Sequence, residues 1–286
     1  MSESVPTTPR DERLPILITI VVLGLALSVL IPLPTRELVL DLLGSELSLR
    51  FSGPVQMIIL MGMLVCVGVD SLLRGDPGDP ASTPSQPSAS EIPSRATSVM
   101  FWALPALLAV LALIILHSLP WWGYQVAFAL ISGGVLATII TWQKETLSLA
   151  GMSRRGLRLA LNGIAYGLAY VLFAMIFGAR LRSMLSATAV MAVSGVLALE
   201  LLRSSDTSTW RPWLYAALTA LIMGEVTWVL NYTRVSNRAG GALLVLIFYV
   251  LTGLAQQYLW ERLNRHVLIE YLVALVFGLG VISLLV

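Results

Sequence analysis

Few side chains in this sequence could do chemistry, and the clearest candidate is a carboxylate inside a long apolar run. Glu225 lies twelve residues after Trp213, which at ~1.5 Å per residue of helix places it about 18 Å from that end of the run. Leu221, Trp228 and Tyr232 share its helical face. A carboxylate at this depth must be protonated, hydrogen-bonded between helices or open to a wet cavity. Glu225, Trp228 and Tyr232 are therefore candidate substrate-binding residues for a proton, a cation or a ligand amine, and the alternative is a hydrogen bond that fixes helix packing.

A second polar stripe runs along another apolar segment. Asn162, Tyr166 and Tyr170 are four residues apart and so share one face of a helix. Tyrosine rings can line a ligand cavity, and they also serve as packing groups whose hydroxyls find partners. We include the three residues in the candidate substrate site. They can belong to it only if this stripe faces the one that carries Glu225. The spacing Gly163-x-x-x-Gly167 on the same segment permits close contact with another helix, but it is common in membrane helices and specific to no function.

Four arginines flank this second segment and could contact a lipid headgroup or another anion. Arg154 and Arg155 precede it, in a basic loop that we expect to anchor on anionic lipid. Arg180 and Arg182 follow it, in a tight turn. A guanidinium can hold a phosphate through two parallel hydrogen bonds, so this turn could bind a lipid or substrate phosphate. The alternative is a pair of solvated turn residues.

Several classes of chemistry are excluded by what the sequence lacks. Its one cysteine, Cys66, excludes an intramolecular disulfide, and one cysteine with two histidines is too few for a zinc site made by the protein alone. There is no G-x-x-x-x-G-K-[ST] loop and no H-E-x-x-H or G-x-S-x-G motif, so we expect no nucleotide and no metal or other cofactor. A net charge of +2 without a dense basic patch argues against nucleic acid.

The composition is that of an integral membrane protein. Of the 286 residues 57% are hydrophobic and 12% are charged, with a mean hydropathy of +0.84, whereas a soluble domain has about 25% charged residues. Backbone groups in hydrocarbon must be satisfied within a segment, and about 20 apolar residues of helix cross a bilayer core of ~30 Å. We therefore predict an all-α polytopic bundle of nine membrane helices, or eight, because only a short polar stretch separates the last two runs. The runs are residues 14–34, 55–73, 99–119, 121–142, 157–178, 183–202, 213–232, 240–259 and 267–286.

Three regions follow from the pattern of these runs. Residues 1–73 form an N-terminal tail and a membrane hairpin, residues 74–98 a disordered linker rich in proline and serine, and residues 99–286 a bundle of seven helices. In the loop of the hairpin, Arg36–Leu43 is predicted as a short amphipathic helical turn on the membrane surface. Leu47–Phe51 then alternates apolar and polar residues, which is typical of a strand.

The distribution of basic residues predicts the orientation. With the N-terminus inside, the inner segments carry about twice as many arginines and lysines as the outer ones. All basic residues except Lys144 are arginine, which indicates a GC-rich prokaryotic genome, so we expect a multi-pass protein of a bacterial or archaeal cytoplasmic membrane. Membrane lipid is an expected partner.

Three functions are compatible with a multi-pass membrane protein that has these candidate residues. The first is a carrier or translocator of a lipid or small solute, with Glu225 near its site. The second is a non-catalytic subunit or scaffold of a larger membrane complex, which would have protein partners. The third is a membrane-embedded lipid or sugar transferase that uses the loop acids Glu37, Asp41 and Glu46. Enzymatic activity stays open, with more support for a protein that is not an enzyme.

Reporter fusions test the orientation. A green fluorescent protein joined after residue 85 should fluoresce, because the linker is predicted to face the cytoplasm, and alkaline phosphatase joined after residue 286 should be active outside. The reciprocal fusions serve as controls and should be silent. Activity of alkaline phosphatase at residue 85 would show that the orientation is reversed.

Overall fold

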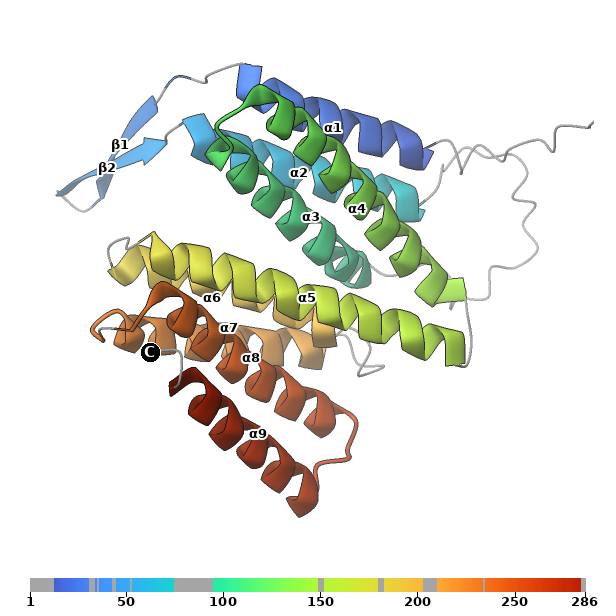
Figure 1. Cartoon of the computed structure of the whole chain (residues 1–286), viewed down its shortest axis with the longest axis vertical. Helices are drawn as coiled ribbons and strands as arrows, with labels where there is room; N and C mark the ends of the chain where they lie inside the picture. The colour runs from blue at the N-terminus through green and yellow to red at the C-terminus, as the bar shows by residue number, and fades with distance from the viewer. Residues whose placement is uncertain are drawn as a thin grey trace, which may run out of the picture. The chain divides into compact units, whose positions relative to one another are not determined.

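The computed structural model describes most of the chain. The described residues are 13–30, 34, 36–42, 45–51, 53–74, 95–148, 152–179, 183–202, 210–233 and 235–283. They form nine α-helices and one β-hairpin (Figure 1). The elements are α1 (Arg13–Leu30), β1 (Arg36–Leu42), β2 (Ser45–Phe51), α2 (Gly53–Arg74), α3 (Arg95–Ser118), α4 (Trp122–Ser148), α5 (Met152–Gly178), α6 (Ser183–Leu202), α7 (Trp210–Leu230), α8 (Asn237–Leu259) and α9 (Arg265–Ser283).

The helices confirm the predicted polytopic membrane bundle. Eight of those in the described part of the chain, α2 to α9, are long and apolar enough to cross a membrane. The apolar part of α1, Leu14–Leu30, is slightly shorter than the length that a span needs, and residues 31–33 of the predicted first run lie outside the described ranges. The last two runs form two separate helices, α8 and α9. The protein is therefore a multi-pass helical membrane protein.

The prediction of an amphipathic helical turn at Arg36–Leu43 is wrong, whereas the strand predicted for Leu47–Phe51 is confirmed. Residues Arg36–Leu42 form β1, which pairs antiparallel with β2. The segment also alternates with period two, through Leu38, Leu40 and Leu42. A helix of seven residues has few internal hydrogen bonds, whereas pairing with a second strand satisfies backbone groups of both segments.

Contacts between helices divide the chain into two compact units. One unit comprises Met1–Pro93 and Pro105–Leu147, and the other comprises Ser94–Leu104 and Ser148–Val286. The helices α4 and α3 from Pro105 onward thus belong with α1 and α2, whereas the predicted regions placed them with α5–α9. The predicted linker, residues 74–98, lies for the most part outside the described residues.

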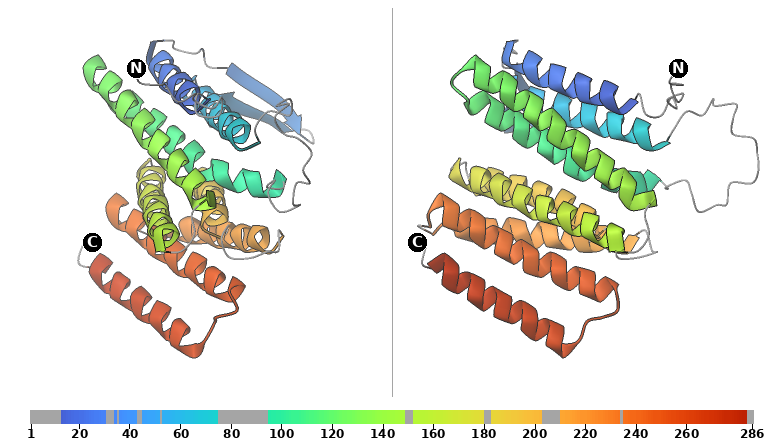
Figure 2. Two further views of the ribbon diagram at one scale, coloured as in Figure 1. Left: turned by 90° about the vertical axis from the view of Figure 1, so that its right-hand side faces the viewer. Right: turned by 45° about the vertical axis from the view of Figure 1, so that its right-hand side comes forward.

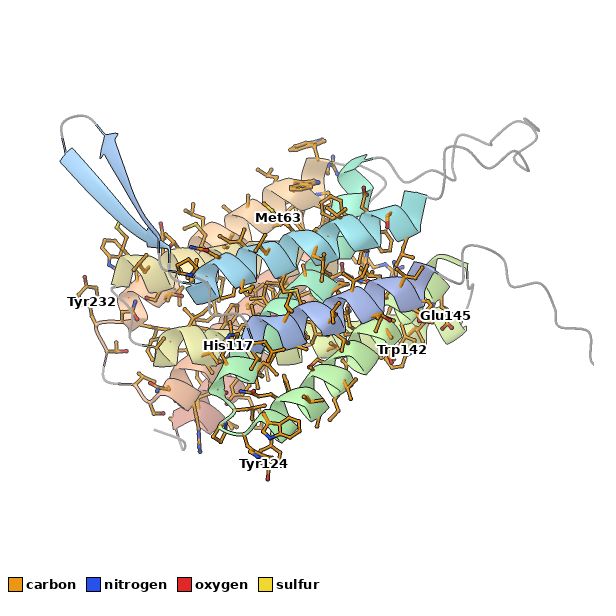
Figure 3. All side chains as sticks on the ribbon, turned by 90° about the horizontal axis from the view of Figure 1, so that it is seen from above. Met63, His117, Tyr124, Trp142, Glu145 and Tyr232 are labelled. Atoms are coloured by element: carbon orange, nitrogen blue, oxygen red, sulfur yellow. The ribbon has the colours of Figure 1, made fainter. Side chains whose placement is uncertain are left out.

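In the first unit, α1 packs between α2 and α4. Its buried face carries Val21 and Leu25, both 1% exposed. The side chain of Leu17 lies where a Cβ on Gly68 of α2 would be, and that of Val22 lies where a Cβ on Gly133 of α4 would be. Glycine at these two positions therefore allows α1 to approach both neighbours closely. Figure 3 shows α1 running alongside α2 and α4.

In the second unit, two helix pairs carry most of the packing, α6 with α7 and α5 with α8. Both pairs meet through glycine. A Cβ on Gly224 of α7 would lie 2.7 Å from the Cε of Met191 in α6, and one on Gly241 of α8 would lie 2.7 Å from the Cβ of Ala174 in α5. The last helix, α9, packs mainly against α8, to which it runs antiparallel (Figure 2).

The close helix contact that Gly163-x-x-x-Gly167 permits is not made in the described part of the chain. No atom lies within 4 Å of the position that a Cβ would take on either glycine. Both residues are exposed on α5, while the α5–α8 contact uses Gly240 and Gly241 of α8 instead. The spacing of small residues permits a close approach but does not select the face that is used.

Two glycine-to-alanine substitutions test this packing. Gly241→Ala should destabilise the protein by about 1–3 kcal/mol, because the added methyl group collides with the backbone and side chain of Ala174. Gly163→Ala is the matched control on α5 and should leave stability unchanged or raise it, since its methyl group meets nothing and alanine favours the helix. Thermal unfolding in detergent measures both, and equal effects would contradict the assigned interface.

Candidate functional site

The residues predicted around Glu225 lie on an exposed face of α7. Glu225 is exposed, Trp228 is 54% exposed and Tyr232, just after the helix, is 76% exposed. Figure 3 shows Tyr232 at the edge of the protein, pointing away from the helices. Within the described residues Glu225 makes no hydrogen bond or ion pair. The buried face of the helix is a different one and carries small and apolar residues such as Ala220 and Met223.

The second predicted stripe faces a different neighbour. Tyr166 is half-buried, and its hydroxyl lies 3.0 Å from Oγ1 of Thr252 in α8, a hydrogen bond between helices. Asn162 is half-buried one turn before it, and Tyr170 is 38% exposed. The helix that carries the stripe, α5, packs against α8 and α6, and the structure does not bring this stripe to the exposed face of α7.

The four arginines predicted to contact lipid or another anion are described only in part. Arg155 is exposed near the start of α5. Arg154 lies in the first turn of the same helix, but its side chain lies outside the described part. Arg180 and Arg182 lie outside the described residues altogether. Their role stays a prediction.

Tyr166 belongs to an aromatic cluster that joins three helices. Its ring centroid lies 5.6 Å from that of Tyr249 and 5.9 Å from that of Phe248, both on α8. The interplanar angles of 66° and 68° are typical of edge-to-face contacts. The ring of Tyr249 lies in turn 5.6 Å from that of Tyr271 on α9. Tyr271 rests on Gly253 of α8, where a Cβ would collide with its ring and hydroxyl. The cluster therefore links α5, α8 and α9.

A polar stripe on α8 underlies this cluster, and we did not predict it. Thr252 is fully buried and also donates to the carbonyl oxygen of Phe248 at 2.7 Å. Nε2 of Gln256, one turn later, donates to the carbonyl oxygen of Leu201 in α6 at 2.8 Å. The spacing of Tyr249, Thr252 and Gln256 at three and four residues was the signal in the sequence that could have shown it.

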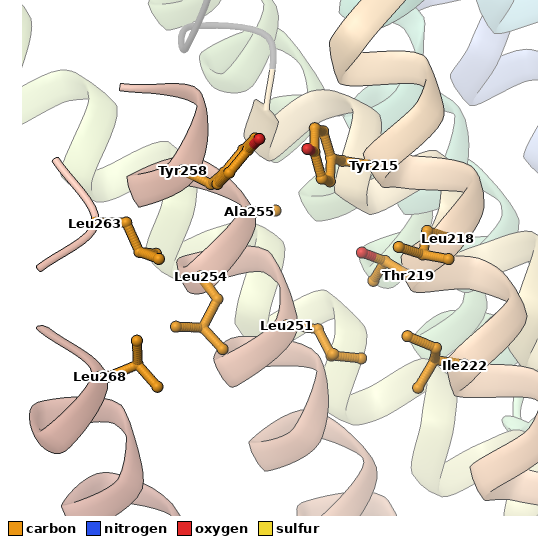
Figure 4. Close-up of a pocket in the computed structure, with 10 residues that line it drawn as sticks. All are labelled: Tyr215, Leu218, Thr219, Ile222, Leu251, Leu254, Ala255, Tyr258, Leu263 and Leu268. Atoms are coloured by element: carbon orange, nitrogen blue, oxygen red, sulfur yellow. The ribbon is translucent and has the colours of Figure 1, made fainter. Parts of the chain in front are cut away.

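A pocket of about 470 Å³ opens between α7, α8 and the start of α9 (Figure 4). Its volume lies in the range that small-molecule sites have, ~300–1,000 Å³. The lining is apolar apart from two tyrosines at one end and one threonine. The lining residues are Tyr215, Leu218, Thr219, Ile222, Leu251, Leu254, Ala255, Tyr258, Leu263 and Leu268.

Helical spacing explains how α7 and α8 form two walls of this pocket. Tyr215 and Ile222 lie seven residues apart on α7, and Leu251 and Tyr258 lie seven apart on α8, so each wall covers two turns, or about 10 Å. The two tyrosine rings meet at 5.4 Å between their centroids. Figure 4 shows this pair at one end of the pocket and the aliphatic side chains lining the rest. The pocket is therefore polar at one end and apolar along its length.

The turn between α8 and α9 forms the third wall. The backbone N–H of Glu261 donates to the carbonyl oxygen of Tyr258. The backbone N–H of Arg262 donates to the carbonyl oxygen of Gln257, and both distances are 3.0 Å. Glu261 takes a φ of 55°. This is the Schellman arrangement, in which a left-handed residue ends a helix and satisfies its last carbonyl groups. It turns the chain back so that Leu263 and Leu268 face α8.

The polar end of the pocket lies at an interface of the predicted membrane. Trp210 and Trp213 begin α7, and Trp260 follows α8, all three exposed. Tryptophan belts mark the level of the headgroups. Arg211 lies one turn before Tyr215 on the same helix. The pocket therefore runs from the headgroup level into the hydrocarbon.

Two other features of the described residues carry less chemistry. A smaller pocket of about 250 Å³ lies in the first unit, between α1, α3 and α4, with Gln125 and Trp122 as its polar members. Nε2 of Gln125 already donates to the carbonyl oxygen of Leu119 at 2.9 Å. No group of three or more His, Cys, Asp or Glu side chains within the described ranges could hold a metal ion.

Comparison with protein families assigns the chain to a family. A family model described as a protein of unknown function, DUF5656, matches residues 33–285, which is most of the chain. The chain belongs to this family. No match was found among curated proteins or among solved structures. The matched range includes all of the pocket, the aromatic cluster and the exposed face of α7, so all three features belong to the family domain.

Two tyrosine-to-phenylalanine substitutions test the cluster. Tyr166→Phe removes the hydroxyl that joins α5 to Thr252 and should destabilise the protein by about 0.6 kcal/mol, the average for such bonds in membrane bundles. Tyr170→Phe, one turn away, is the matched control and should have no effect, because its hydroxyl has no partner in the described residues. The free energy of unfolding in mixed micelles measures both. A larger loss in Tyr170→Phe would contradict this account of the stripe.

Proposed function

We propose that the protein binds an amphipathic lipid between α7, α8 and α9 and acts as a carrier of that lipid. The observation that carries the proposal is the form of the pocket, which is apolar along about 10 Å of two helices and bears two tyrosine hydroxyls at one end. The proposal keeps the lipid carrier among the functions that the sequence suggested, but it places the ligand away from Glu225.

The apolar length of the pocket supports a hydrocarbon chain as the ligand. Leu251, Leu254 and Leu268 offer no hydrogen bond to a polar solute. Burying an acyl or isoprenoid chain against them contributes about 0.8 kcal/mol per methylene group in water, but much less here, since the chain comes from lipid that is equally apolar. Selectivity must therefore come from the polar end.

The polar end supports a ligand with a headgroup at the membrane surface. Tyr215 and Tyr258 each carry a hydroxyl that can donate or accept a hydrogen bond. Arg211 lies one turn before Tyr215 on α7. This guanidinium, together with the two hydroxyls, favours an anionic headgroup such as a phosphate.

The packing of α9 supports exchange of the ligand with the membrane. This helix is nearly all exposed, and it packs mainly on α8, through Tyr271 on Gly253 and Leu246 on Gly278. A helix with so few buried contacts opens at low cost. Movement of α9 would widen the third wall of the pocket and admit a lipid from the side.

A pocket-filling substitution tests lipid binding. Leu254→Trp adds an indole to the middle of the pocket and should lower the amount of co-purified lipid at least severalfold, measured by native mass spectrometry of the full chain. Leu272→Trp on α9 is the matched control, because Leu272 is exposed and does not line the pocket. Its lipid content should equal that of the natural protein.

The same measurement separates the carrier from the second candidate, a subunit of a larger complex. Bound lipid that both variants retain equally would contradict the proposal. A stoichiometric partner protein without specific lipid would favour the subunit. Added phospholipids with phosphate, serine or choline headgroups then distinguish the chemistry of the polar end, and equal retention of all three would contradict a selective carrier.

A further inference from the structure

The exposed face of α7 differs from an ordinary lipid-facing surface because it carries a carboxylate. We define the α7 face by Leu214, Leu221, Glu225 and Trp228, which follow one another at helical spacings of seven, four and three residues. Leu214 is 51% exposed and Leu221 is 49% exposed. None of these four residues lines the lipid pocket, although Leu218 of the pocket lies between Leu214 and Leu221 on the same side of the helix.

A carboxylate on this face is costly when only lipid surrounds it. Glu225 lies five residues before the end of α7 at Leu230, so its Cα is about 8 Å inside that end of the helix. Insertion of an acidic residue into hydrocarbon costs ~2.5 kcal/mol or more at the centre of a span and less toward the ends. Because Glu225 has no hydrogen-bond partner in the described part of the chain, contact with a donor from outside would remove most of this cost.

The α7 face also carries the donor that such a carboxylate needs. The indole N–H of Trp228 can only donate, and a carboxylate can only accept. Trp228 lies three residues after Glu225, about 4.5 Å further along the axis, and helical side chains tilt back toward the N-terminus. Within one chain this tryptophan is exposed and makes no hydrogen bond in the described residues. Donor and acceptor are thus both present and both unused.

A face with one donor and one acceptor at nearly the same depth is complementary to itself. All copies of a membrane protein have the same orientation, so two α7 helices from two copies pack in parallel about an axis along the membrane normal. Such a two-fold contact is isologous, which means that each pairwise contact between the two copies occurs twice, once in each direction. Each Glu225 then lies beside the Trp228 of the second copy, and Leu221 of each copy lies near the axis.

We propose that the α7 face is a homodimer interface, in which Glu225 of each copy accepts a hydrogen bond from the indole N–H of Trp228 of the other. The occupant is a second copy of this chain. Leu221, one turn before Glu225, and Leu214, three turns before it, supply the apolar part of the contact. The four residues of this interface do not themselves line the lipid pocket.

Cysteine cross-linking in membranes tests which face meets a second copy. In a Cys66→Ser background of the full chain, Leu221→Cys should form a disulfide-linked dimer on mild oxidation. Val273→Cys on α9, which is 60% exposed, is the matched control and should stay monomeric. Equal dimer in the two variants, a link from residue 221 to another protein, or a Leu221→Cys band that stays monomeric would each overturn the proposal.

Substitution of the donor and the acceptor tests the hydrogen bonds themselves. Glu225→Leu and Trp228→Phe each remove both symmetric bonds, and each should weaken dimerisation in nanodiscs or vesicles roughly fivefold to tenfold, at about 0.6 kcal/mol per bond. The two substitutions combined should weaken it no further, because they remove the same bonds. Dimerisation that both variants leave unchanged, or effects that multiply in the double variant, would overturn the pairing. Lipid retention, which uses other residues, should be unaffected in all three variants, so failure here is distinguishable from failure of the lipid proposal.

Discussion

The structure depends on one constraint, which is that hydrocarbon offers no hydrogen-bond partner to the backbone. Each span is therefore a helix, and even the polar side chains inside the spans are mostly satisfied by their own helix. Oγ1 of Thr227 donates to the carbonyl oxygen of Met223 at 2.7 Å, and Thr252 and Thr188 make the same bond four residues back. Only a few polar groups are left to join one helix to another, such as Tyr166, Gln256 and Asn231.

Because burial of apolar surface drives association only weakly in a bilayer, shape decides which helices pack. Glycine admits Met191 to α7, Ala174 to α8 and Val22 to α4, and these close approaches hold the pairs within each unit. The contact of α9 is thinner and rests mainly on two glycines, with Tyr271 on Gly253 and Leu246 on Gly278. The gap left beside that contact is the pocket, so the same packing rule produces both the stable pairs and the accessible site.

The polar groups of the second unit fall into two sets with different consequences. One set, around Tyr166, Thr252 and Tyr249, is closed on itself and stabilises the bundle. The other set lies at surfaces, where the tyrosine pair borders an apolar pocket and Glu225 is exposed. For a family whose function is unknown, these two surfaces are where we propose that a lipid and a second copy of the chain bind.

The sequence by itself determined the class of the fold, because length and hydropathy of a run are enough to predict a membrane helix. It also contained the strand at Leu47–Phe51, and the period-two pattern of its partner could have been seen as well. Which polar residues meet was decided only by the tertiary structure. The faces of Tyr166 and Glu225 have the same periodicity, yet one is covered by α8 and the other is exposed. Gly163 and Gly241 likewise look equivalent in the sequence, and only Gly241 touches a neighbour. The physical reason is that helical spacing defines a face, whereas the rotation of each helix about its axis depends on every neighbour at once.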